Sequence, residues 1–158
     1  MYKGKGKRAY DALLRYMTMD HFCPEMPLTE INKISMLGLA HVGDAVYELL
    51  TRTMLCRQGH SAVARMHKLA VSYVNAPAQA RAAEKILPRL TDAERDIYRR
   101  GRNAKVHSVP QHADLAQYHA ATGLEVLFGW LYLQGKTERV NDLFTAITQN
   151  GGEENNAP

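Results

Sequence analysis

Two apolar stretches of the sequence each carry a glycine and a single carboxylate where the interior of a helix is expected. The first stretch holds Gly43 and Asp44, and the second holds Glu125 and Gly129. Glycine inside a helix costs roughly 1 kcal/mol relative to alanine, so its presence there indicates that two helix backbones approach closely. A carboxylate in apolar surroundings is costly unless it is paired, protonated or bound to a cation. If the two helices cross near these positions, the two carboxylates converge.

Local signals predict helices along most of the chain and no strands. No segment combines period-two alternation with β-branched enrichment, which is the pattern of a half-buried strand. Thr91 is a good N-cap because Asp92 and Glu94 follow it, and Asn75 and Ser61 are further candidate caps. With glycine and proline as stop signals, helices are predicted at residues 9–19, 36–57, 61–73, 75–88, 91–101, 114–134 and 137–149, and a loop at 101–112. The predicted fold class is all-α.

The composition suits one globular domain. The 158 residues are 46% hydrophobic and 23% charged, which allows a core of useful size. We divide the chain into an N-terminal extension with a helix at 1–28, a domain at 29–150 and a tail at 151–158 that is expected to be disordered. No run approaches the roughly 20 apolar residues of a membrane helix, and no signal-peptide pattern is present. Cys23 and Cys56 form no ligand cluster and are expected to be free thiols in a reducing cytoplasm.

A pair of converging carboxylates suits a hard divalent cation. Mg²⁺ and Mn²⁺ prefer oxygen ligands, and Mg²⁺ is often held by one or two carboxylates together with water and substrate phosphate. Asp44 and Glu125 are therefore predicted to bind Mg²⁺ for phosphodiester chemistry. The alternative is that each acid pairs with an arginine or faces solvent. Glu48 is more simply explained by a helix ion pair with Arg52, and the histidines show no zinc-binding spacing.

A basic segment precedes the second acidic stretch. The chain carries a net charge of +4 with a pI near 9.1, which only modestly favours a nucleic-acid partner. The candidate phosphate-binding residues of this segment are Arg100, Arg102, Asn103 and Lys105. A solvated basic helix end that complements the helix dipole is the alternative explanation. Because the segment leads directly into the helix of Glu125, we favour a phosphate-binding element beside a metal site, which is the arrangement that a nuclease needs.

These residues together resemble a known family. The segment 39–46, with Gly43 and Asp44, resembles the signature of ribonuclease III nuclease domains. Glu125, followed four residues later by Gly129, resembles the second acidic motif of that family. The segment 100–105 is similar to a more specific signature of the Mini-ribonuclease III subgroup, which consists of the nuclease domain alone. The resemblance runs in the right order from about Ile34 to Leu143.

Two departures from classical ribonuclease III point to the same subgroup. Classical members have two further acids, four residues before the aspartate and three before the glutamate, where this sequence has Ala40 and Thr122. Mini-ribonuclease III is similarly depleted at these positions. Classical members also carry a C-terminal domain that binds double-stranded RNA, for which we expect no room after the helix of Glu125.

The resemblance implies a compact all-α homodimer whose 29–150 region is the nuclease domain. It also implies Mg²⁺-dependent cleavage of double-stranded RNA, with Mn²⁺ as a possible substitute, in maturing the ends of the 23S ribosomal RNA precursor. Asp44 is then the essential metal ligand and Glu125 its partner. Two other interpretations stay open: a catalytically inactive module of the same fold that binds RNA or the ribosome, and a purely structural helical dimer.

Overall fold

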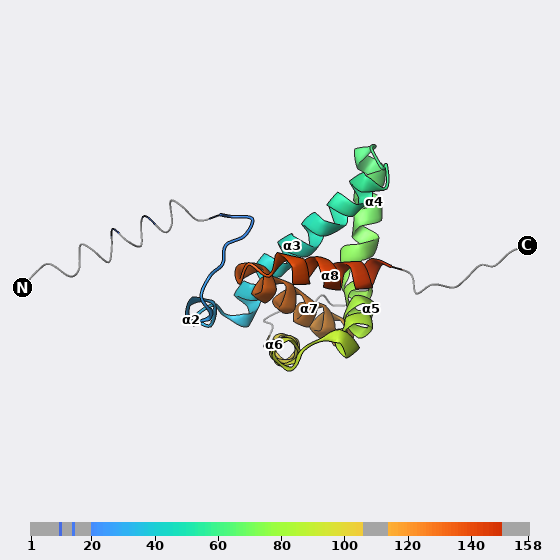
Figure 1. The fold of residues 1–158 in the computed structure, drawn as a ribbon. Helices are drawn as coiled ribbons and strands as arrows, with labels where there is room; N and C mark the ends of the chain where they lie inside the picture. The colour runs from blue at the N-terminus through green and yellow to red at the C-terminus, as the bar shows by residue number, and fades with distance from the viewer. Residues whose placement is uncertain (1–9, 11–13, 15–19, 106–113, 150–158) are drawn as a thin grey trace, which may run out of the picture.

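The computed structural model describes Tyr10, Leu14 and residues 20–105 and 114–149 (Figure 1). The predicted helix at 9–19 falls almost wholly outside the described residues, as do the predicted tail at 151–158 and residues 106–112 of the predicted loop. The division of the chain into extension, domain and tail therefore stays a prediction.

Helices account for the regular structure of the described ranges, and no strand is found in them, which confirms the predicted all-α class. The elements are α2 (Leu28–Ile31), α3 (Met36–Arg57), α4 (Val63–Val74), α5 (Ala76–Ile86), the 3₁₀-helix η1 (Leu87–Arg89), α6 (Asp92–Arg102), α7 (Leu115–Leu133) and α8 (Thr137–Thr148).

Side-chain hydrogen bonds mark where two of these helices begin, whereas a third begins without one. Asn75 accepts a hydrogen bond from the backbone N–H of Ala78 at the start of α5, as predicted. Thr91 forms a reciprocal capping box with Glu94 at the start of α6, also as predicted. The expected cap at Ser61 is wrong: the N-cap of α4 is Ala62, whose side chain has no oxygen that could accept a hydrogen bond from the first turn.

Helix α7 forms the centre of the fold, and α3, α5 and α6 pack around it (Figure 1). Every residue from Ala121 to Leu131 is buried except Glu125. A helix that is apolar on all sides is stable only when neighbours cover it completely. Phe128 is fully buried and packs edge-on against Tyr47 of α3, which in turn packs against Phe144 of α8. Glu125 is thus a polar exception within the most buried segment of α7.

The backbones of α3 and α7 touch where the two helices cross. A Cβ atom added to Gly43 would lie 1.7 Å from the carbonyl oxygen of Glu125, and one added to Gly129 would lie 2.1 Å from the carbonyl oxygen of Leu39. No side chain larger than hydrogen fits at either position. The close helix contact predicted from the two glycines is therefore confirmed.

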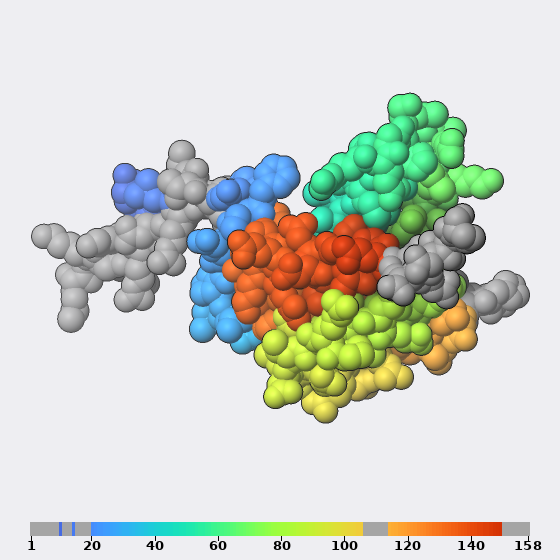
Figure 2. Space-filling view, turned by 45° about the vertical axis from the view of Figure 1, so that its right-hand side comes forward, coloured from blue at the N-terminus to red at the C-terminus, as the bar shows by residue number. Residues whose placement is uncertain are grey.

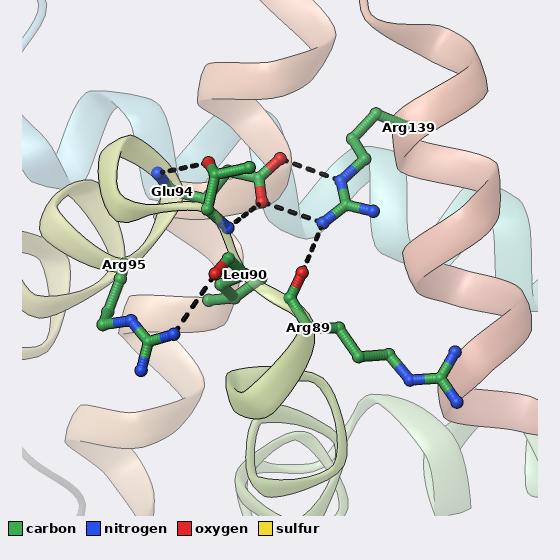
Figure 3. Close-up of polar contacts among 6 residues, drawn as sticks. Arg89, Leu90, Glu94, Arg95 and Arg139 are labelled. Carbon is green, nitrogen blue, oxygen red and sulfur yellow. Dashed lines mark hydrogen bonds and ion pairs between the residues drawn. The ribbon is translucent and has the colours of Figure 1, made fainter.

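A partly buried ion pair joins α6 to α8 (Figure 3). The Arg139 guanidinium donates to both carboxylate oxygens of Glu94 at 2.8 and 2.9 Å, and also to the carbonyl oxygen of Arg89. The Glu94 carboxylate also accepts from the backbone N–H of Thr91 in the capping box. The hydrogen bonds from Arg139 are the main reason that the pKa of Glu94 is lowered. This network holds α6, and the basic residues at its end, in a defined orientation.

The outer half of α3 and the whole of α4 extend away from the body of the molecule (Figures 1 and 2). Ala70 is the one buried residue of α4, so this arm has little core of its own. Among the described helices, none is both long enough and apolar enough to cross a membrane.

We predict that Gly43→Ala strongly destabilises the protein, because the added methyl group must push two helix backbones apart. Overpacking a core typically costs about 1–3 kcal/mol, and a clash with backbone atoms belongs at or above the top of that range. Urea-induced unfolding followed by circular dichroism measures the decrease. Gly38→Ala in the same helix is the matched control, since its methyl group meets side-chain atoms of Ile34 and Ser35 rather than the backbone of another helix. Equal stabilities of the two variants would contradict the prediction.

Candidate active site

The helix crossing places the two predicted acids side by side. Asp44 directly follows Gly43 on α3, and Gly43 lies against the backbone of Glu125 on α7. The negative charge of Asp44 contributes to raising the pKa of Glu125, which shows that the two carboxyl groups interact. The convergence expected from the sequence is therefore present in the structure.

Glu125 has a strongly perturbed carboxyl group. Burial raises the pKa of this group most, the charge of Asp44 raises it further, and an interaction with the Gln79 side chain lowers it; the resulting pKa is about 7. A carboxyl group in this state is half protonated near neutral pH, so a divalent cation that stabilises its charged form is favoured there. Perturbed carboxyl groups of this kind are common at functional sites.

Asp44 is the solvent-exposed member of the pair of acids. Its side chain is exposed, so the expectation that both acids are buried in apolar surroundings is wrong for Asp44. The periodicity of α3 places Asp44 on one side with buried Ala40 and Tyr47, but no neighbouring helix covers that side at Asp44. Partial loss of hydration still raises the pKa of Asp44, the charge of Glu48 raises it further, and His41 lowers it.

Gln79 is a site residue that the sequence interpretation missed. It lies in the first turns of α5, is 1% exposed, and its side chain interacts with the Glu125 carboxylate. Its Nε2 atom nevertheless has no hydrogen-bond partner that meets normal geometry among the described residues. A buried polar group without a partner costs about 1–3 kcal/mol, so its retention needs an explanation. The sequence offered one signal for this residue: Gln79 is a polar residue at helical spacing from the apolar Ala83 and Ile86.

The two positions where classical relatives have acids are buried in this structure. Ala40 is 6% exposed and Thr122 is 5% exposed. The Thr122 hydroxyl donates to the carbonyl oxygen of Tyr118 in its own helix, at 3.1 Å. No group of three or more His, Cys, Asp or Glu side chains in the described ranges could hold a metal ion. Asp44 and Glu125 can thus supply two carboxylates to a cation, with further ligands coming from water or phosphate.

The predicted basic residues lie at the end of α6, which packs against α7. The exposed residues of this group are Arg100, Arg102, Asn103 and Lys105. Gly101, between them, packs against Val126 of α7. None of the interactions described for Asp44 or Glu125 involves these basic side chains. The structure therefore presents them to solvent next to the α7 helix but does not bring them into contact with the acids.

Comparison with known proteins agrees with this site. The Ribonuclease III domain family matches residues 37–136, which include the α3–α7 crossing and both acids. The chain belongs to the ribonuclease III family. Family members are endoribonucleases that act on double-stranded RNA, and this chain is one of them.

The relatives also identify the subgroup, Mini-ribonuclease III. The chain is 46% identical over 110 residues to Mini-ribonuclease 3 of Symbiobacterium thermophilum, covering 70% of this chain and 85% of the relative. It is 38% identical over 130 residues to Mini-ribonuclease 3 of Enterococcus faecalis, covering 81% and 98%. The crystal structure of a Fusobacterium nucleatum protein is similar, with a TM-score of 0.67, 30% identity, and coverage of 75% of this chain and 94% of that one.

We predict that Glu125→Gln stabilises the metal-free protein at alkaline pH. The pKa of Glu125 is about 7 in the folded state, against a usual 4.5. Between pH 4.5 and pH 7, therefore, the folded protein keeps a proton on Glu125 that the unfolded chain has released. The contribution of Glu125 to the free energy of unfolding is therefore fully present below pH 4.5 and is lost as pH rises through 7. The loss is on the order of 3 kcal/mol. Urea unfolding in chelator at pH 4.5 and pH 8 measures the difference. A stability gain from Glu125→Gln of the same size at both pH values would contradict it.

Proposed function

We propose that this ribonuclease III family member uses Asp44 and Glu125 to bind Mg²⁺, or Mn²⁺ in its place, and cleaves double-stranded RNA to mature the ends of the 23S ribosomal RNA precursor. The single observation that carries the metal-dependent step is the convergence of the two carboxyl groups, in which the charge of Asp44 opposes ionisation of the partly buried Glu125. A cytoplasmic location fits this substrate and the two free cysteines, Cys23 and Cys56.

The donor set suits a hard cation. Two carboxylates that repel each other are each stabilised when a divalent cation lies between them, and oxygen ligands are what Mg²⁺ and Mn²⁺ prefer. When bound, such a cation activates water and stabilises the leaving oxygen of a phosphodiester. In this proposal the exposed Asp44 is the ligand on the substrate side of the site, and the more enclosed Glu125 is the inner ligand. His41 lowers the pKa of Asp44, but its imidazole supplies no carboxylate oxygen for a cation.

The end of α6 is the proposed RNA-binding element. Arginine and lysine bind phosphate oxygens without reading sequence, and asparagine can contact sugar or base edges. A-form RNA presents phosphates and 2′-hydroxyls across a wide, shallow minor groove, so recognition rests mainly on shape. Arg100, Arg102, Asn103 and Lys105 are all exposed, and the Glu94–Arg139 ion pair holds the helix that carries them. Their exposure allows them to follow the backbone of a duplex.

An apolar pocket beside Asp44 supports the proposed homodimer. It has a volume of about 480 Å³ and is formed by α3, α7, α8 and the segment before α2. Its lining includes His41, Ala45 and Leu49 of α3, and Phe22, which is 78% exposed. Large exposed apolar patches usually mark association surfaces. Because Ala45 of the lining directly follows Asp44 on α3, we infer that a second copy bound here brings the two active sites toward one duplex.

A catalytically inactive module that binds RNA or the ribosome is the alternative. The buried Ala40 and Thr122, in place of the two further acids of classical members, favour it. Retention of the interacting Asp44–Glu125 pair favours the enzyme instead, because a pair of repelling carboxyl groups destabilises a fold that has no use for them.

Incubation of the protein with double-stranded RNA, first with Mg²⁺ and then with chelator, separates the two functions: binding without cutting identifies the inactive module.

We predict that Asp44→Asn reduces cleavage of double-stranded RNA by at least about a thousandfold while the fold and RNA affinity are retained. The substitution removes one of two carboxylates yet keeps the size of the side chain, and the side chain is exposed. Single-turnover cleavage, circular dichroism and a filter-binding assay measure the three properties. Glu30→Gln, an exposed acid on α2, is the control. Full activity of Asp44→Asn would reject the assignment of the site.

We predict that the double substitution Arg102→Ala and Lys105→Ala weakens RNA binding and makes it less dependent on salt. Removing one phosphate-binding charge reduces the slope of log K against log[salt] by roughly 0.7–0.9 for nucleic acids of DNA-like charge density. Fluorescence anisotropy with a labelled RNA duplex at several salt concentrations measures the slope. Arg57→Ala with Arg65→Ala, which removes the same charge from the α3–α4 arm, is the comparison. An unchanged slope in the α6 variant would remove this element from the binding surface.

We predict that Leu49→Asp dissociates the homodimer. Leu49 is 54% exposed and lies in the apolar pocket, so a charge there is tolerated in the monomer but must be desolvated in a dimer. Sedimentation velocity of wild type and variant measures the mass, with Val63→Asp on α4 as an exposed apolar control. A monomeric wild-type protein, or a dimeric Leu49→Asp variant, would place the interface elsewhere or exclude it.

A further inference from the structure

Gln79 stands out as the one polar residue in a stripe of α5 that is otherwise apolar. Helix α5 packs against α7, and in its buried stripe Gln79 is followed by Ala83 and Ile86. Glutamine is rarely fully buried because both ends of its amide need partners. Here the side chain is 1% exposed and its Nε2 atom has no hydrogen-bond partner among the described residues. Packing alone would be served better by leucine or methionine of similar volume.

The start of α5 holds this amide in a fixed place. Asn75 caps the helix through the backbone N–H of Ala78, and the Gln79 N–H donates to the Asn75 carbonyl oxygen at 3.0 Å. Pro77 in the first turn adds rigidity to the backbone. The Gln79 side chain therefore reaches α7 from a rigid helix start, where it meets the Glu125 carboxylate.

We propose that Gln79 is a positioning residue for the metal site: its buried amide, which has no partner of normal geometry among the described residues, donates to one oxygen of Glu125 when a cation holds that group in its charged form, and so leaves the other oxygen free to bind the cation. This inference rests on the metal site proposed above. A donor that fixes a metal-binding carboxylate performs the role that outer-shell hydrogen bonds have in other metal sites. The role is most needed here, because the two acids of classical relatives are replaced by Ala40 and Thr122. An amide can orient Glu125 without adding another negative charge beside Asp44.

Metal affinity, kinetics and stability together test this role. Gln79→Leu and Gln79→Met keep the volume and remove the donor, and Gln134→Leu is the matched control. Gln134 lies nine residues beyond Glu125, roughly 13 Å along α7, and its amide donates to the Trp130 carbonyl oxygen. Calorimetry with MnCl₂ gives the cation affinity. Cleavage of a double-stranded RNA under Mg²⁺ gives kcat and KM, and thermal unfolding in chelator gives the stability.

The positioning role predicts that both Gln79 variants bind Mn²⁺ about tenfold or more weakly than wild type, as is usual when an outer-shell partner is removed. It also predicts a fall in kcat with KM changed less than about twofold, and a melting temperature at or above that of wild type, because an unpartnered buried amide has been replaced by an apolar group. The Gln134→Leu variant should keep wild-type Mn²⁺ affinity. Unchanged Mn²⁺ affinity in both Gln79 variants, or a lowered melting temperature with an unchanged affinity, would overturn the inference.

The same measurements keep this inference separate from the proposed nuclease activity. If wild type binds Mn²⁺ but cuts no double-stranded RNA, the proposed function fails while the Mn²⁺ affinities of the Gln79 variants still decide the positioning role. If wild type cuts RNA and the Gln79 variants match it in affinity and kcat, only the positioning role fails.

Discussion

The contact between the backbones of α3 and α7 is the constraint on which the rest of the structure depends. Gly43 and Gly129 leave no space for a side chain, so the two helices meet at a single register. Helix packing in general is set by ridges of side chains that fit into grooves, with axes about 8–10 Å apart. Here the missing side chains bring carbonyl oxygens against the facing backbone. A shift by one residue along either helix would produce a clash, so the position of Asp44 relative to Glu125 is set by main-chain atoms rather than by flexible side chains.

This geometry places the carboxyl groups of Asp44 and Glu125 close enough to repel each other when both are charged. Glu125 is the one residue between Ala121 and Leu131 that is not fully buried, and it lies close enough to Asp44 for the two charges to oppose each other. Burial and repulsion raise its pKa to about 7, which makes the metal-free site a source of instability near neutral pH. Stability sacrificed at a site in this way is typical of functional residues. Beside the same carboxylate, the buried Gln79 amide adds a second group that has no normal hydrogen bond among the described residues. In the proposed metal site, a cation that favours the charged form of Glu125 relieves both.

Local sequence signals predicted most helix ends because those ends depend on residues only three or four positions apart. The range of α3 agrees with the prediction at both ends, and the caps at Asn75 and Thr91 form as expected. Ser61 is not the cap because α4 begins one residue later, with Ala62 as its N-cap. The exposure of Asp44 was not predictable from local signals: helical periodicity identifies its side of α3, but only the neighbouring helices decide whether that side is covered.

The sequence by itself determined the all-α class, the glycine-mediated helix contact and the identity of the two acids, because helical periodicity, the cost of glycine and the cost of a charge in apolar surroundings are local properties. The tertiary structure decided which groups surround those acids. It left Asp44 exposed, partly enclosed Glu125, brought Gln79 from α5 to the same carboxylate, and packed the end of α6 against Val126 of α7. These outcomes depend on contacts between residues far apart in the sequence, and such contacts are set by the packing of whole helices.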